Sequence, residues 1–236
     1  MTEGGKGNLR ILTWNIHRGI GNHGAYDLLP IARLVAGHNP DIVALQEVDS
    51  RGHDKSADTP IRLLSESLGE HVAEARTIAA PDGHYGHVLI SRWPLSPPTL
   101  HDISVPHREP RCVIETVAAT PAGPVHLAAV HLGLRIRERK RQAVRLADIA
   151  RSAAPLSIML GDFNDWPWRG IVRRTLADAL PGRTRLKTYP ALLPLLMLDR
   201  IYCRPAGALL RSWTDRHGRR FSDHLPVIGE ISLTAM

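Results

Sequence analysis

The segment Phe221-Ser222-Asp223-His224-Leu225-Pro226-Val227 sets an aspartate and a histidine side by side, immediately before an apolar run of strand character. Earlier in the chain, Gly161-Asp162-Phe163-Asn164 follows another apolar run. Carboxylates suit Mg²⁺, and an imidazole can transfer a proton or stabilise an anion. Together, the two segments indicate metal-assisted hydrolysis of a phosphate ester.

The composition is that of an ordinary globular protein. Of the 236 residues, 43% are hydrophobic and 22% are charged, which is far from the composition of disordered chains. Layered α/β domains often reach this length, so we expect a flexible N-terminus at residues 1–8 and a single domain at residues 9–236.

The net charge of +7 indicates anionic partners. Phosphate esters, nucleic acid and acidic lipid headgroups are the classes of molecule that a basic protein attracts. Arginines cluster at residues 135–145 and 216–220. Such clusters are as typical of solvated faces as of binding surfaces, so both interpretations stay open.

Cysteine content and apolar segments predict the compartment. Cys112 and Cys203 lack metal-type spacing and are too few for a disulfide scaffold, which favours a reducing environment. The N-terminus has no apolar signal region, and the apolar residues 191–198 are too few to span a bilayer. We expect a cytoplasmic monomer without a transmembrane segment.

Apolar periodicity predicts alternating strands and helices. Residues 9–15 and 41–46 are predicted strands, and the helix between them is capped by Asp27. The Pro-rich segments 94–98 and 106–110 are predicted loops. Further strands are expected at residues 72–79, 88–91, 112–119, 125–130, 157–160, 201–202 and 227–231, with helices ending at Leu68, following His131 and following Pro167.

Polar residues end corresponding strands in the two halves of the chain. Asn15 and Glu47 are separated by almost the same number of positions as His131 and Asp162. This match suggests two related sheet-plus-helix halves, each delivering two polar groups to one rim. Each residue alone has a structural alternative: a solvated Glu47, a core Asn15, a structural His131, or an Asp162 turn that caps a helix.

Six segments in this order resemble the endonuclease/exonuclease/phosphatase superfamily, and in particular its small bacterial members. The superfamily includes DNase I, abasic-site endonucleases, sphingomyelinases and inositol polyphosphate phosphatases. The segments are Thr13-Trp14-Asn15-Ile16, Leu45-Gln46-Glu47-Val48, Val130-His131-Leu132, Gly161-Asp162-Phe163-Asn164, Leu198-Asp199-Arg200-Ile201 and Ser222-Asp223-His224-Leu225-Pro226-Val227.

The resemblance implies an α/β fold of the DNase I-like type. This fold is a four-layer α/β/β/α sandwich in which two mostly antiparallel sheets pack face to face. By position, Glu47 would be the main Mg²⁺ ligand, with Asn15 and Asp223 near the ion. Mn²⁺ would be the substitute metal.

The resemblance also implies the catalytic roles. Asp162 would position the attacking water, and Asn164 would bind the scissile phosphate. His224 would stabilise the transition state or transfer a proton. Asp199 would pair with His224, and His131 would be a second imidazole at the site.

Substrate contacts are predicted from three further residues and one segment. Arg111 is a candidate phosphate clamp, and Trp166, with Trp168, is a candidate apolar contact beside Asn164. His87 stands where the superfamily usually has Asn. Residues 191–198 are interpreted either as buried core or as an apolar lip, with core the preferred reading.

The leading hypothesis is a Mg²⁺-dependent phosphodiesterase or phosphatase that acts on a small or lipid-linked substrate. The alternative within the same class is a non-specific DNA endonuclease or exonuclease. The alternative of another class is an inactive module that binds an anionic ligand. A zinc hydrolase is disfavoured, because the chain lacks a His-Glu-x-x-His motif and its candidate ligands are mainly oxygens.

Overall fold

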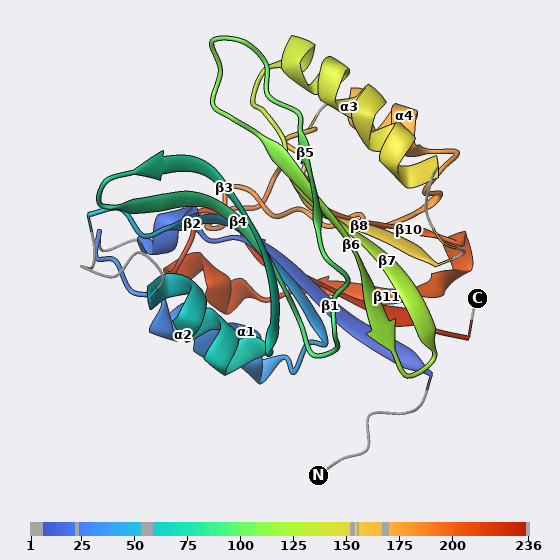
Figure 1. The fold of residues 1–236 in the computed structure, drawn as a ribbon, viewed down its shortest axis with the longest axis horizontal. Helices are drawn as coiled ribbons and strands as arrows, with labels where there is room; N and C mark the ends of the chain where they lie inside the picture. Colours follow the sequence, from blue (N-terminus) through green and yellow to red (C-terminus); the bar gives the residue numbers. More distant parts are fainter. Residues whose placement is uncertain are drawn as a thin grey trace.

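The computed structural model describes residues 7–21, 24–52, 59–151, 154, 156–166 and 170–234. Within these ranges the strands form two six-stranded sheets (Figure 1). The strands are β1 (Asn8–Asn15), β2 (Ile42–Asp49), β3 (His71–Ala80), β4 (Gly83–Ser91), β5 (Thr99–Asp102), β6 (Cys112–Thr120), β7 (Gly123–His131), β8 (Ser157–Asp162), β9 (Gly182–Arg183), β10 (Asp199–Arg204), β11 (Leu209–Thr214) and β12 (Val227–Ser232). The helices are α1 (Leu29–Gly37), α2 (Thr59–Leu68), α3 (Ile136–Arg151) and α4 (Ile171–Leu176), with short 3-10 turns η1 (His17–Gly19), η2 (Ala206–Ala208) and η3 (Arg216–Arg220).

The two sheets share one topological feature. The first has the order β11-β12-β1-β2-β4-β3 and the second has the order β5-β6-β7-β8-β10-β9. Only β1 with β2 and β7 with β8 pair in parallel among the named strands; all other named pairs are antiparallel. A helix, α1 or α3, connects each parallel pair. Both halves therefore bring the carboxyl ends of two neighbouring strands to the same edge, as the matching polar residues suggested.

The sheets face each other, and helices cover their outer faces. Figure 1 shows α1 and α2 on one outer side and α3 and α4 on the other. One apolar core lies between the sheets and includes Ile11 and Leu127. A second joins the first sheet to α1 and α2 through Trp14 and Ile31, and a third joins the second sheet to α3 and α4. The predicted four-layer α/β/β/α sandwich is confirmed.

Strand alternation decides which side chains reach the space between the sheets. In β1, Leu9 and Ile11 enter the inter-sheet core, while Leu12 and Trp14 pack on the helix side. Asn15 has the same parity as Leu9 and Ile11, so its amide points between the sheets. The same parity places three further strand-end residues on this side: His131 on β7, Asp162 on β8 and Asp199 on β10.

Some boundaries differ from the sequence-based prediction. Strand β4 begins at Gly83 and β2 continues to Asp49, so both are longer than expected. The short edge strand β5 lies between two Pro-rich segments and was missed. Asp27 accepts a hydrogen bond from the backbone N of Leu29, but the N-cap of α1 is Leu28 and not the predicted Asp27.

Further sequence-based expectations concern the N-terminal segment, the two cysteines and the absence of a transmembrane helix. Residues 1–6 and 167–169, and with them most of the predicted N-terminal segment and Trp168, lie outside the described residues. Cys112 and Cys203 are free thiols. Across the part of the chain that the structure describes, no helix combines the length and apolarity needed to cross a membrane.

Gly161 is expected to be required for the close pairing of β7 and β8. A Cβ at this position would lie 1.9 Å from the carbonyl oxygen of Val130, and φ is +145°. Gly161→Ala should lower the free energy of unfolding by about 2 kcal/mol or more. Urea denaturation followed by circular dichroism measures this loss.

Gly37→Ala is the matched control, because a Cβ there meets nothing within 4 Å. Because Ala favours a helix over Gly, the unfolding free energy of this variant should stay the same or rise by up to about 1 kcal/mol. Equal stability of the two variants would show that the strands tolerate a side chain at Gly161.

Candidate active site

The carboxyl ends of β1, β2, β7 and β8 meet around a cleft of about 420 Å³. Its lining carries several carboxylates and imidazoles, two asparagine amides and two arginines. The lining residues are Asn15, His17, Arg18, Glu47, Tyr85, Glu109, Arg111, His131, Leu134, Asp162, Asn164, Tyr189, Leu198, Asp223 and His224.

A bulge in β2 turns Glu47 into the cleft. Val43 and Leu45 pack on the helix side, so simple alternation would send Glu47 to the same side. The pairing register with β4 shifts between Gln46 and Val48, and φ is +59° at Glu47. Val48 takes the place in the helix-side core, and the carboxylate of Glu47 is left facing the cleft.

Unusual backbone conformations gather at this cleft. Among the described residues, six that are not glycine have positive φ. Four of them line the cleft: His17, Arg18, Glu47 and Asn164. Each such conformation costs about 1–3 kcal/mol and persists only where the surroundings enforce it. The cleft is therefore held in one shape by the packed strands below it.

Asn15 links the two sheets. Its Nδ2 donates to Glu47 Oε1 at 3.0 Å and to Asp162 Oδ2 at 3.1 Å. Its Oδ1 accepts from the backbone N of His17 at 3.1 Å. One amide thus fixes a carboxylate from each sheet at the same point.

His131 is a neutral imidazole held by Arg111. Arg111 can only donate, so its Nη1 donates to His131 Nδ1 at 3.0 Å. Burial, and then the nearby charge of Arg111, hold the pKa of His131 well below its usual value. The protonated nitrogen is therefore Nε2, which lies 3.8 Å from Asp162 Oδ2 and 4.0 Å from Glu47 Oε1.

His224 is the charged imidazole of the site. Its Nδ1 donates to Asp199 Oδ2 at 2.8 Å. Burial opposes protonation, but the carboxylates of Asp199 and Asp162 outweigh it and raise the pKa of His224 to about 10. The ring also lies against Tyr189, with centroids 4.9 Å apart.

Asp162 and Asn164 form a tight turn at the end of β8. Burial, and then the charge of Asp199, raise the pKa of Asp162 to about 6. Asp162 Oδ1 accepts from the backbone N of Asn164 at 2.9 Å, and Asn164 Nδ2 donates to Leu132 O at 2.9 Å. One hydrogen of that amide remains for a ligand.

Two groups of residues in the described part of the chain offer oxygen ligands to a cation. Glu47 and the half-exposed Asp223, with Asn15 beside them, supply hard oxygens at the open side of the cleft, which fits Mg²⁺. Asp162, Asp199 and His224 form a buried group whose ligand atoms lie within 4.8 Å of one another. The imidazolium of His224 already supplies the positive charge there, so the open group fits a cation better.

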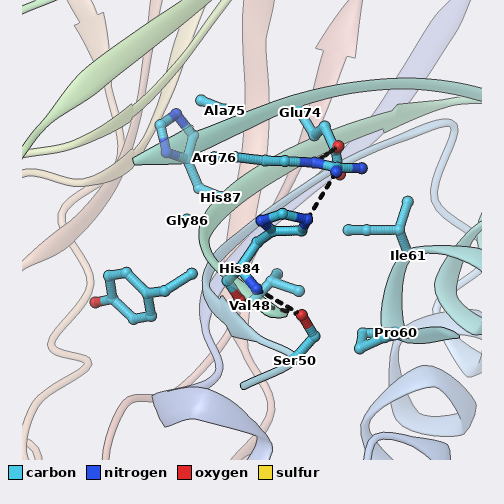
Figure 2. A pocket seen from close by; sticks show the side chains of 11 residues that line it. Val48, Ser50, Pro60, Ile61, Glu74, Ala75, Arg76, His84, Gly86 and His87 are labelled. Carbon is cyan, nitrogen blue, oxygen red and sulfur yellow. Dashed lines mark hydrogen bonds and ion pairs between the residues drawn. The ribbon is translucent and has the colours of Figure 1, made fainter. Parts of the chain in front are cut away.

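The structure places two predicted substrate contacts outside the cleft. His87 is buried between the sheets, its Nε2 has no hydrogen-bond partner among the described residues, and burial lowers its pKa to about 4. Figure 2 shows it at a separate small pocket on the β3–β4 hairpin, with its ring turned away from His84. Strand parity, which points His87 inward, could have corrected this prediction.

Trp166 lies beside the cleft and not in it. It lines a neighbouring hollow of about 630 Å³, together with Leu134 and several arginines. Leu134 belongs to the walls of both, so the two hollows adjoin.

Sequence reasoning missed several cleft residues. Tyr85, Glu109 and Tyr189 line it, and Glu109 forms an ion pair of 2.7 Å with Arg111. Glu109 lies two positions before Arg111, a predicted substrate contact, so its sequence position could have indicated that it lines the cleft. Tyr189 reaches the cleft on a loop that no local sequence pattern predicts.

The apolar segment 191–198 is divided between core and surface. Leu198 is buried and lines the cleft, but Leu192, Leu193 and Leu195 are exposed. The preferred reading of this segment as buried core is wrong for these three leucines.

The sandwich with an oxygen-rich cleft at one edge of two facing sheets defines a DNase I-like protein. The model of the Endonuclease/Exonuclease/phosphatase family matches residues 12–224, so the chain belongs to this family.

Relatives cover nearly the whole chain. The uncharacterized protein YbhP of Escherichia coli (strain K12) is 32% identical, and the alignment spans 96% of this chain and 97% of YbhP. An endonuclease/exonuclease/phosphatase from Beutenbergia cavernae DSM 12333 shares the fold with a TM-score of 0.77 at 20% identity, covering 96% of this chain and 72% of that one. D. rerio TDP2, complexed with single strand DNA product, gives a TM-score of 0.63 at 16% identity, covering 94% and 98%.

Replacing Asp199 is expected to lower the pKa of His224. The Asp199 carboxylate stabilises the imidazolium more than any other group, so Asp199→Asn should reduce the pKa by about one to three units. NMR titration of the imidazole signals in the presence of a chelator measures this shift. Asp215→Asn removes the partner of His38 and should leave His224 unchanged; an unaltered His224 titration in Asp199→Asn would contradict the assignment.

Proposed function

We propose that the protein is a divalent-metal-dependent hydrolase of phosphate esters, a phosphodiesterase or phosphatase acting on a small or lipid-linked substrate. The observation that supports it most is the convergence of Asn15, Glu47, Asp162 and His131 within hydrogen-bonding or near-contact distance in a cleft open to solvent. Family membership supports the same class of reaction.

Glu47 would hold Mg²⁺, with Asp223 near the ion and Mn²⁺ as a substitute, and Asn15 would orient the Glu47 carboxylate beside the ion through its Nδ2. When bound, the cation supplies positive charge that offsets the charge developing on the phosphoryl oxygens. The three residues come from β2, from the loop before β12 and from β1, and all three line the same cleft.

The remaining groups of the cleft have complementary roles in this proposal. Asp162 orients the attacking water, because its Oδ2 lies beside Asn15 and His131 at the cleft floor. Asn164 donates its second amide hydrogen to a phosphoryl oxygen. His224 Nδ1 is bound to Asp199, so Nε2 is the nitrogen left to donate to the substrate.

Arg111 serves as the phosphate clamp. Its guanidinium is buried at the cleft wall between Glu109 and His131, and its Nε has no hydrogen-bond partner among the described residues. Because Arg111 also lines the cleft, its guanidinium would face a phosphate bound there. The cleft retains the residues assigned to metal binding, water orientation and proton transfer, including Glu47, Asp162 and His224. We therefore favour an enzyme over the inactive binding module.

The second candidate is a nuclease acting on DNA. The hollow next to the cleft is lined by several arginines and Trp166, which are residue types that bind nucleic acid. D. rerio TDP2, which shares the fold, is complexed with single strand DNA product.

Glu47→Ala is expected to abolish hydrolysis. With bis-p-nitrophenyl phosphate and Mg²⁺ or Mn²⁺, turnover should fall by at least about a hundredfold, because the carboxylate that holds the cation is lost. Asn164→Ala and His224→Ala should each slow turnover by about 10²–10³-fold.

Glu66→Ala is the matched control, since Glu66 is an exposed residue of α2 and is not among the residues that line the cleft. It should retain the wild-type rate. Wild-type turnover in Glu47→Ala would mean that the hydrolysis arises elsewhere or from a contaminant.

Salt dependence is expected to separate the two candidate substrates. A substrate with one phosphate exchanges few counterions, so kcat/KM should depend only weakly on NaCl concentration. Plasmid DNA cleavage by an enzyme that contacts several phosphates should fall steeply over about 50–200 mM salt. A steep slope together with fast plasmid cleavage would favour the nuclease.

A further inference from the structure

Exposed apolar side chains are concentrated beside the cleft. Among the described residues, ten large apolar side chains are exposed. Five of them lie on two segments that border the cleft, and a sixth, Trp166, lines the hollow that adjoins it. Their exposed fractions run from 55% for Trp166 to 70% for Leu134. The six are Leu134, Ile136, Trp166, Leu192, Leu193 and Leu195, which we call the apolar rim.

Two side chains of α3 form hydrogen bonds with the backbone of the first segment of the apolar rim, which carries Leu134 and Ile136. The buried Arg139 donates through Nη1 to Gly133 O at 3.2 Å and to Leu134 O at 2.5 Å. Gln142 Oε1 accepts from Gly133 N at 3.0 Å. The exposure of Leu134 and Ile136 is therefore a property of a fixed backbone.

The second segment is a hydrogen-bonded turn attached to the other wall. Tyr189 O accepts from the backbone N of Leu195 and of Leu196 at 2.9 and 2.8 Å. Ala191 N donates to Asp223 O at 2.7 Å. Leu192, Leu193 and Leu195 are thus presented by a turn that is tied directly to a residue lining the cleft.

Positive charge accompanies the apolar rim. The hollow that adjoins the cleft is lined by five arginines and one glutamate, and that Glu138 is buried. Arg108, Arg135, Arg137 and Arg141 are exposed there, around Ile136 and Trp166. Apolar side chains next to exposed arginines match the composition of surfaces that bind anionic membranes.

Aliphatic side chains favour a lipid over a nucleic acid. Single-stranded nucleic acid is bound by aromatic side chains on which its bases stack. The apolar rim contains five aliphatic residues and only Trp166 as an aromatic. Leucine and isoleucine gain from contact with acyl chains, whereas a base offers them no comparable burial.

We propose that the apolar rim docks on an anionic lipid bilayer, with its leucines at the headgroup and acyl boundary and its arginines on lipid phosphates. The cleft then opens onto the membrane surface, so that a headgroup phosphate ester reaches Glu47 and Asp162. The docking stands on the surface alone; the identification of the substrate as a membrane lipid rests on the proposed hydrolytic function.

Vesicle flotation tests the docking. The probes are vesicles of phosphatidylglycerol with phosphatidylcholine, and vesicles of phosphatidylcholine alone. Wild-type protein should float with the anionic vesicles, and Leu192→Ser/Leu193→Ser/Leu195→Ser should reduce the partition coefficient by at least about tenfold. Leu134→Ser/Ile136→Ser should have an effect in the same direction.

Leu100→Ser/Leu210→Ser is the matched control, because both leucines are exposed but lie on β5 and β11, outside the cleft lining. Its binding should stay within about twofold of wild type. Arg135→Gln/Arg137→Gln/Arg141→Gln should remove the preference for anionic vesicles. Thermal melting followed by circular dichroism verifies that each variant is folded.

The outcomes separate the docking from the hydrolysis. Failure of wild-type protein to float, or equal loss in the control and rim variants, overturns the docking. Binding of a single-stranded oligonucleotide without vesicle binding also overturns it. Flotation that depends on the rim supports the docking even if wild-type protein fails to hydrolyse bis-p-nitrophenyl phosphate, in which case the hydrolytic proposal alone fails.

Discussion

One side-chain amide holds the two halves of the site together. Asn15 Nδ2 donates to Glu47 of the first sheet and to Asp162 of the second, at 3.0 and 3.1 Å. Two carboxylates would repel each other across the gap between the sheets, and a shared donor offsets part of that repulsion. The inter-sheet core below fixes how far apart the strands lie, so the packing of the sandwich sets the spacing of the chemical groups.

Much of this arrangement could be predicted from sequence because strand ends carry it. Polar residues that interrupt apolar runs marked Asn15, His131 and Asp162, and the near-equal spacing in the two halves matched the two parallel pairs. The order of the motifs along the chain added the family resemblance, and with it the four-layer sandwich. The pairing of Asp199 with His224 was also expected, and these two side chains lie 2.8 Å apart.

The remaining features depend on tertiary structure that no local pattern encodes. No sequence pattern in residues 42–49 predicts the bulge in β2. Without this bulge, the Glu47 side chain would face the helices. Tyr189 enters the cleft on a loop whose course is set by long-range backbone hydrogen bonds to the segment around Asp223. A run of leucines at 191–198 resembles core in sequence, and only the folded loop shows that three of them are exposed.

We propose that Glu47, which the β2 bulge turns into the cleft, anchors a cation at the open side of the cleft. Anomalous diffraction from crystals soaked in Mn²⁺ tests it most directly, because it locates the ion without relying on activity. We expect the anomalous peak next to the Glu47 carboxylate, within reach of Asp223. A peak enclosed by Asp162, Asp199 and His224, with none at Glu47, would contradict this account of the site.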